Sequence, residues 1–198
     1  MSAYSATPHD SRGASWPLDQ SRRIANIRAV LALAWAALII AVGSDAPTTA
    51  SDLATGVAAL LASYPLIDVV ASIAGARYDR TCRNILRVNA AISTAAVVAI
   101  AVTGFGFDAG AALVSFGAWA AISGALQFGV AIHRRRSRGS QLPMIISAGL
   151  STIAGLGFIA QSGGNDAHLT YIGGYMALGA LLYLFSALRG RAHSRPAE

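Results

Sequence analysis

Residues 53–76 read LATGVAALLASYPLIDVVASIAGA, and this stretch decides the fold class of the chain. The run contains a single charged residue, Asp68, and it is followed at once by the basic stretch RYDRTCR of residues 77–83. A helix needs about 20 mostly apolar residues to cross a hydrocarbon core about 30 Å thick. We therefore expect a transmembrane helix that ends at a basic membrane edge.

Similar runs recur along the rest of the chain. They are apolar on all faces, which suits helices surrounded by lipid and by other helices, and none alternates as transmembrane strands do. The six expected spans are Ile24–Gly43, Leu53–Ala76, Ile85–Phe105, Ala111–His133, Leu142–Gln161 and Leu169–Leu188. We predict an all-α fold, a six-helix transmembrane bundle in residues 23–189. A flexible cytoplasmic tail, residues 1–22, is expected before it, and a second tail, residues 190–198, after it.

The composition supports this class. Of 198 residues, 55% are apolar and 12% are charged, whereas about 25% charged residues are usual in a soluble domain. The one cysteine, Cys82, excludes a disulfide scaffold. The composition therefore predicts a multi-pass membrane protein.

The basic residues indicate the orientation. All 15 are Arg, and they fall in the N-terminal segment, between spans two and three, between spans four and five, and in the C-terminal tail. The other three loops contain only acidic charges, namely Asp45, Asp52, Asp108 and Asp166. Under the positive-inside rule both termini are cytoplasmic.

We attribute the net charge of +6 to Arg residues that set the membrane topology and contact anionic head groups, and not to nucleic-acid binding. Arg134, Arg135 and Arg136 form the densest basic patch and are the candidate head-group contact. The expected partners are membrane lipids, with no nucleic acid, and a homo-oligomer is left open.

The Arg clusters that begin at Arg77, Arg134 and Arg189 are almost equally spaced. One interpretation is three helical hairpins in tandem. The other is that any six-helix protein with short loops has this spacing. Small residues at four-residue spacing predict close helix packing; they are Gly117, Ala121, Ala125 and Gly129 in one span, and Ser147, Ser151 and Gly155 in the next.

Two stretches carry a resemblance to a known family. Residues 118–127, AWAAISGALQ, lead through the Arg cluster to residues 144–155, MIISAGLSTIAG. This pattern resembles the HdeD-like short-repeat membrane proteins. The resemblance implies a six-helix inner-membrane protein, linked in some bacteria to acid resistance, with no catalytic residues to carry over. The segment Tyr64–Asp68 departs from the usual pattern of that family.

Asp68 is the most informative residue, because a carboxylate inside a span costs about 2.5–3.5 kcal/mol on insertion scales and usually faces a partner. Tyr64 and Ser72 share its helix face. Pro65 removes a backbone hydrogen bond one turn earlier, so a kink is expected there. At similar depth lie Asn89, Ser93 and Gln127. Arg28 or Arg87 could reach inward with its long stem and meet the carboxylate.

This polar cluster has two interpretations. It is either a structural network that fixes helix register or a cytoplasm-facing cavity for a proton, an ion or a small ligand. The four His share no helix face with other ligands at metal spacing, so neither a metal nor a cofactor is expected.

Three functions stay open. The first is a non-enzymatic stress-related membrane protein. The second is a small channel or transporter with its site at Asp68. The third is an integral-membrane enzyme acting on a lipid or isoprenoid.

Overall fold

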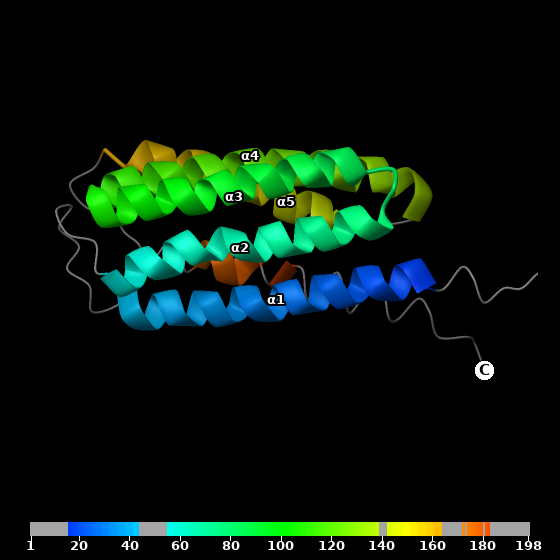
Figure 1. The fold of residues 1–198 in the computed structure, drawn as a ribbon, viewed down its shortest axis with the longest axis horizontal. Coiled ribbons are helices and arrows are strands. Elements are labelled where there is room, and N and C mark those ends of the chain that lie inside the picture. Colours follow the sequence, from blue (N-terminus) through cyan, green and yellow to red (C-terminus); the bar gives the residue numbers. More distant parts are fainter. Residues whose placement is uncertain are drawn as a thin grey trace, which may run out of the picture.

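The computed structural model describes residues 16–43, 55–138 and 142–163, together with residues 172, 174–179, 181 and 182. Five helices follow one another along the chain: α1 (Trp16–Gly43), α2 (Thr55–Tyr78), α3 (Arg83–Gly106), α4 (Ala109–Arg138) and α5 (Leu142–Gln161). The described residues between 172 and 182 are helical too, and no strand occurs in the described ranges. The prediction of an all-α fold is confirmed. The helices run side by side along the long axis of the molecule (Figure 1).

The ends of the helices differ from the predicted spans where polar residues continue a helix. α1 begins at Trp16, inside the segment expected to be a flexible tail. Pro17 does not prevent this, because proline is tolerated in the first turn of a helix. α4 continues through the Arg cluster to Arg138, since Arg is a good helix former. Much of the sixth expected span, and Asp45, Asp52 and Asp166, lie outside the described residues.

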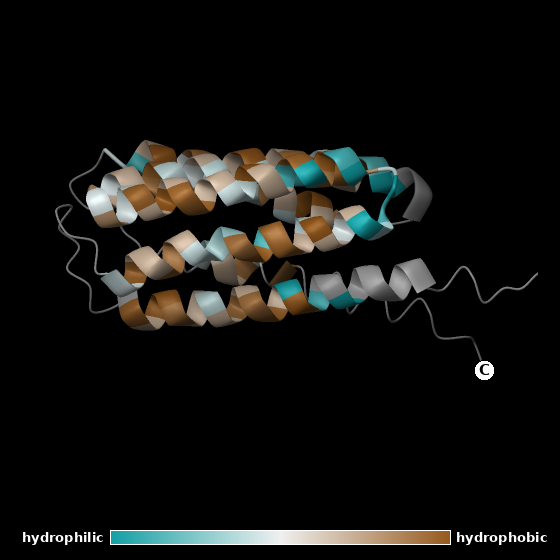
Figure 2. Ribbon diagram, viewed as in Figure 1, coloured by the Kyte–Doolittle hydropathy of each residue, from teal (hydrophilic) through white to brown (hydrophobic). Residues whose placement is uncertain are grey.

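Among the described residues, four helices are long and apolar enough to cross a membrane: α2, α3, α4 and α5. The apolar part of α1, Asn26–Val42, is shorter. Hydrophobic residues extend along the helices, and hydrophilic residues gather toward the end where α2 joins α3 (Figure 2). These features are those of a membrane protein.

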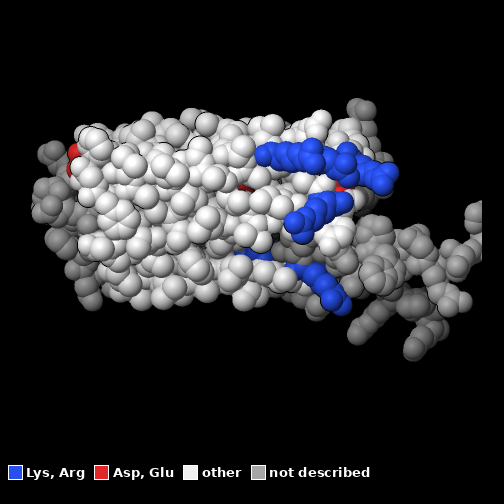
Figure 3. All heavy atoms as spheres, viewed as in Figure 1, with Lys and Arg blue, Asp and Glu red and all other residues white. Residues whose placement is uncertain are grey.

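Charge separates the two ends of the bundle. On the face seen in Figure 3, the Arg side chains lie toward the end that holds the α2–α3 connection, which we call the Arg end. Asp108 belongs to the α3–α4 connection at the opposite end.

The most extensive packing joins α2 to α3 and α4 to α5. These pairs are connected at the Arg end, by residues 79–82 in the first case. The tandem-hairpin interpretation instead pairs α1 with α2 and α3 with α4, and these contacts are less extensive. The main packing units are therefore displaced by one helix from the predicted hairpins.

The α4–α5 contact brings two backbones together at Gly117 and Gly155. A Cβ atom on Gly155 would lie 2.5 Å from the carbonyl oxygen of Gly117. The predicted small-residue line is only half right, because Gly129 faces open space and Ala125 is exposed. Gly124 takes their place, and a Cβ there would lie 2.8 Å from the Thr152 nitrogen.

An aromatic cluster fills the half of the bundle away from the Arg end. Phe116 is fully buried at its centre, and ring centroids lie 5.3 Å from Trp119 and 6.0 Å from Tyr64. Phe158 and Tyr175 extend it toward α5 and the residues beyond. Among the described residues, large aromatic side chains therefore form the core of this half.

Candidate functional site

Asp68 lies near the middle of α2 and is 2% exposed. The helix is continuous through Pro65, which is also buried. Because proline offers no N–H, one carbonyl of the preceding turn lacks its helical donor. A buried carboxylate at this depth requires compensating donors from neighbouring helices.

An arginine of α1 supplies the opposite charge. Arg28 Nη2 lies 2.5 Å from Asp68 Oδ1, and 20% of the Arg28 side chain is exposed. Arg28 enters the bundle from near the polar end of α1, so its long aliphatic stem spans the distance to the carboxylate. The pair links α1 to α2, and the positive charge of Arg28 compensates the negative charge of Asp68.

Helices α3 and α4 supply neutral donors to the same carboxylate. The Oδ2 atom of Asp68 accepts hydrogen bonds from Asn89 Nδ2 at 2.6 Å, from Ser123 Oγ at 2.8 Å and from Ser93 Oγ at 3.1 Å. The Oδ1 atom accepts a hydrogen bond from Gln127 Nε2 at 3.2 Å. Four helices thus meet at one side chain.

A second set of hydrogen bonds holds these donors in place. Asn89 Nδ2 also donates to Ser72 Oγ at 2.8 Å, and Trp119 Nε1 donates to Ser93 Oγ at 3.0 Å. The Nδ2 atom of Asn89 therefore faces two acceptors, which fixes the orientation of the amide. Its Oδ1 atom is buried and has no hydrogen-bond partner among the described residues.

Most residues of the predicted cluster lie together here: Asp68, Ser72, Arg28, Asn89, Ser93 and Gln127. Tyr64 lies in the aromatic cluster next to it. Arg87 does not belong to the cluster, because its side chain is exposed on α3. Ser123 was not predicted, although its position four residues before Gln127 places both on one helix face.

A second ion pair lies nearer the Arg end and was also not predicted. Arg134 Nε donates to Asp79 Oδ2 at 2.8 Å, and Asp79 is 6% exposed. The Oδ1 atom of Asp79 accepts from the backbone N–H groups of Thr81 and Cys82, so it also orders the start of α3. The sequence does not single out Asp79, because this residue lies inside an Arg cluster just beyond the expected span.

This pair changes the picture of the Arg134–Arg136 patch. Arg134, expected to contact head groups, turns inward to Asp79 and is 20% exposed. Arg135 is exposed, and the side chain of Arg136 lies outside the described set. The head-group contact stays a prediction for Arg135 and Arg136.

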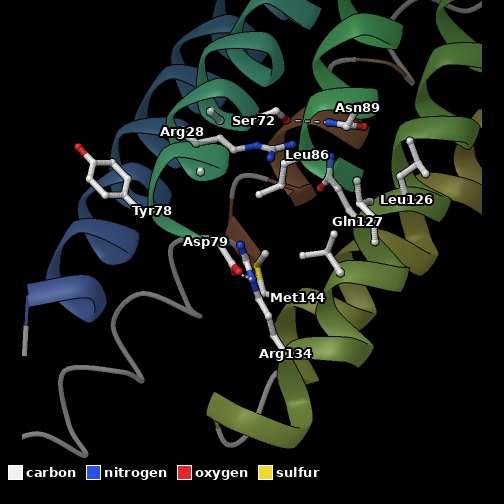
Figure 4. A pocket seen from close by; sticks show the side chains of 14 residues that line it. Arg28, Ser72, Tyr78, Asp79, Leu86, Asn89, Leu126, Gln127, Arg134 and Met144 are labelled. Carbon is white, nitrogen blue, oxygen red and sulfur yellow. Dashed lines mark hydrogen bonds and ion pairs between the residues drawn. The ribbon is translucent and has the colours of Figure 1, made fainter. Parts of the chain in front are cut away.

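Two cavities flank the Asp68–Arg28 pair. The larger, of about 110 Å³, reaches from Arg28 and Asn89 to Asp79 and Arg134, and we call it the Arg-end cavity (Figure 4). Its wall includes Tyr78, which is 50% exposed at the surface.

The second cavity, of about 50 Å³, lies deeper and is called the central cavity. Asp68, Ser123, Ser147 and Ser151 line it together with Tyr64 and Tyr175 of the aromatic cluster. Arg28 and Gln127 line both cavities, so these two side chains form the partition between them.

The arrangement suits binding of a small polar molecule. Polar groups converge on one carboxylate, and apolar side chains such as Leu86 and Leu126 line the space beside them. Within the described part of the chain, no group of three or more His, Cys, Asp or Glu residues is placed to hold a metal ion.

Comparisons with known proteins found no match to a family model, to a curated protein or to a solved structure. The site is therefore interpreted from its own geometry.

Proposed function

We propose that this chain is a multi-pass protein of the inner (plasma) membrane that binds and transports a small solute at the Asp68–Arg28 pair. It has six spans with both termini in the cytoplasm, so the Arg end is the cytoplasmic end. The solute enters the Arg-end cavity from the cytoplasm and reaches the central cavity when Arg28 and Gln127 move.

The observation that carries this proposal is the position of the ion pair between two cavities. A network with a purely structural role would be expected to be packed without cavities, because the atoms that line a void lose van der Waals contacts. The aromatic cluster, which lies on the side of the central cavity away from the Arg end, supports access from the Arg end. A transporter in an inward-facing state has this asymmetry.

Two other functions find less support. An enzyme acting on an isoprenoid would need an elongated apolar pocket, whereas the two cavities are about 110 and 50 Å³; a cavity that binds benzene, a much smaller molecule, has about 150 Å³. The stress-related role implied by the HdeD-like resemblance rests on that resemblance alone.

The proposal is tested by solute flux into proteoliposomes. Stopped-flow light scattering would follow a panel of small neutral, anionic and cationic solutes with the wild-type protein and two variants. Asp68→Asn removes the charge at the site, and Asp108→Asn makes the same change at the opposite end. We expect flux of at least one solute with the wild type and Asp108→Asn, and its loss in Asp68→Asn.

Size-exclusion elution and thermal unfolding would verify that both variants are folded before flux is compared. If no solute of the panel crosses faster than in protein-free liposomes, the transport proposal is wrong. The same holds if a folded Asp68→Asn variant transports as the wild type does.

A further inference from the structure

We propose that the outer surface where α2 is connected to α3 binds the head group of an anionic phospholipid through its phosphate. We call this surface the hairpin patch, and it consists of Arg77, Arg80, Arg83 and Arg87. The proposal does not depend on solute transport, because it concerns the outside of the bundle. It depends on the charges of the patch, on its place at the membrane edge and on the apolar surface beside it.

The hairpin patch carries positive charge that the described residues do not compensate. Arg77, Arg80 and Arg87 are exposed, and none of them forms a hydrogen bond or an ion pair with a described residue. The one acid of this stretch, Asp79, is buried and pairs with Arg134. Neighbouring like charges repel one another, so an anion from outside the protein would stabilise the patch.

Arg83 connects the two helices that contribute to the patch. Its Nε atom donates a hydrogen bond to the carbonyl oxygen of Ala76 at 3.1 Å, so its side chain lies against the last turn of α2, which also contains Arg77. Arg87 follows Arg83 by one helical turn, and residues at this spacing share a helix face. Guanidinium groups from both helices therefore meet on one surface, toward the Arg end of the face seen in Figure 3. Their planar N–H groups match the oxygen atoms of a phosphate.

The patch lies where lipid head groups are expected. α3 begins at Arg83 and is one of the helices that are long and apolar enough to cross a membrane. A long Arg side chain near the end of such a helix extends to the interface. Tyr78, between α2 and the patch, is 50% exposed, and tyrosine is enriched at membrane–water interfaces. A phosphate bound here would therefore belong to the membrane surface.

An apolar stripe continues from Arg87 along the same face of α3. Its residues are exposed and carry no charge: Ala91, Ala95, Val98 and Val102. In a membrane this stripe would contact acyl chains, because hydrocarbon surrounds a spanning helix at that depth. A phospholipid has both the phosphate for the arginines and the chains for the stripe. A water-soluble phosphate has only the first of these.

Native mass spectrometry of the full chain, purified in detergent, provides the test. The protein would be titrated with dioleoylphosphatidylglycerol, whose head group is an anion. Dioleoylphosphatidylcholine has the same chains and the same phosphate but also a cation, which the arginines repel. We expect the anionic lipid to bind more tightly. Arg77→Gln and Arg87→Gln should each weaken its binding about fivefold, which is the effect of one Arg at an anionic membrane surface.

Arg135→Gln provides the matched control. Arg135 is exposed on α4 at the same end of the bundle, so this variant removes the same charge from another place. The contact predicted for Arg135 is a general attraction to the membrane surface, and its loss should leave the affinity for the first bound lipid unchanged. Thermal unfolding would verify that all three variants are folded. An excess of glycerol 3-phosphate, which has no acyl chains, should not displace the lipid.

Three results would overturn the proposal. Equal affinity for the two lipids would show that the head-group charge is not recognised. Equal weakening by Arg87→Gln and Arg135→Gln would reduce the patch to a general charge effect. Displacement by glycerol 3-phosphate would make a water-soluble phosphate ester the ligand. Solute flux is measured separately with Asp68→Asn, so the failure of either proposal is distinguishable from the failure of the other.

Discussion

Arg28 Nη2 on α1 lies 2.5 Å from Asp68 Oδ1 on α2, and Arg28 lines both the Arg-end cavity and the central cavity. The pair has two consequences. It neutralises an acid in the middle of an apolar helix, and it places a movable side chain between two hollow spaces. We expect Arg28 to move more easily than Asp68, because its side chain is longer and more exposed.

The first prediction concerns the stability that this pair provides. Arg28→Gln leaves Asp68 buried without its counter-charge, and such a loss typically costs about 3–5 kcal/mol. The double variant Arg28→Gln, Asp68→Asn removes both charges and should lose less than the sum of the two single variants. Thermal unfolding in detergent measures the cycle. Losses that simply add up would show that the two side chains are not coupled.

A second prediction concerns the connection between α2 and α3. Asp79 accepts two backbone N–H bonds there and pairs with Arg134, while Cys82 is 1% exposed. Asp79→Ala should loosen this turn by about 1–2 kcal/mol, as loss of a helix-capping carboxylate does. Labelling of the Cys82 thiol by a maleimide should become faster.

The matched control for this turn is Asp108→Ala. Asp108 also accepts a backbone N–H, from Ala111 at 2.7 Å, but it lies at the opposite end of the bundle. Its substitution should leave the labelling rate of Cys82 unchanged. An equal rate in Asp79→Ala and the wild type would mean that Asp79 does not hold the turn.

The third prediction concerns the contact between α4 and α5. Gly155→Ala forces a methyl group against the Gly117 carbonyl, and such overpacking costs about 1–3 kcal/mol. Gly149→Ala lies on the same helix where a Cβ meets nothing within 4 Å, so it should be neutral or slightly stabilising. Melting temperatures of the two variants test the difference. Equal melting would contradict the close backbone contact.

The fourth prediction concerns topology. In a Cys82→Ser background, a cysteine at Asp108 should react with an impermeant thiol reagent added outside intact cells, and a cysteine at the exposed Arg80 should not. After the membrane is opened, both should react. The reverse pattern would place the Arg end outside.

The helices could be predicted from the sequence, because long apolar runs that end at Arg clusters have the length and composition of membrane-spanning helices. α5 matches its predicted span, Leu142–Gln161, at both ends. The first residue of α1 could not be predicted from hydropathy, because the first turns of this helix are polar. Which helices pack most closely could not be predicted either, since lipid-facing and helix-facing sides are equally apolar.

The site could be predicted in part for a similar reason. A lone acid in a span requires partners, and the polar residues at its depth were few, so Asn89, Ser93 and Arg28 stood out. Arg87 was indistinguishable from Arg28 by depth, and only the rotation of α3 places it outside. Asp79 and Ser123 depend on side-chain directions between helices that are far apart in the chain, which the sequence does not encode locally.

Thiol labelling from the cytoplasmic side measures access to the Arg-end cavity. Ser72 lines this cavity, and Ser72→Cys in the Cys82→Ser background changes one atom there. We predict that methyl methanethiosulfonate, a neutral reagent of six heavy atoms, modifies Ser72→Cys in inverted membrane vesicles and not in right-side-out vesicles, with glutathione trapped in the lumen of both to consume any reagent that crosses the membrane. Val70→Cys, on the exposed outer face of α2, should react in neither. A Ser72→Cys thiol that is inert from both sides, or that reacts only from outside, would contradict a cytoplasm-facing solute site at Asp68 and Arg28.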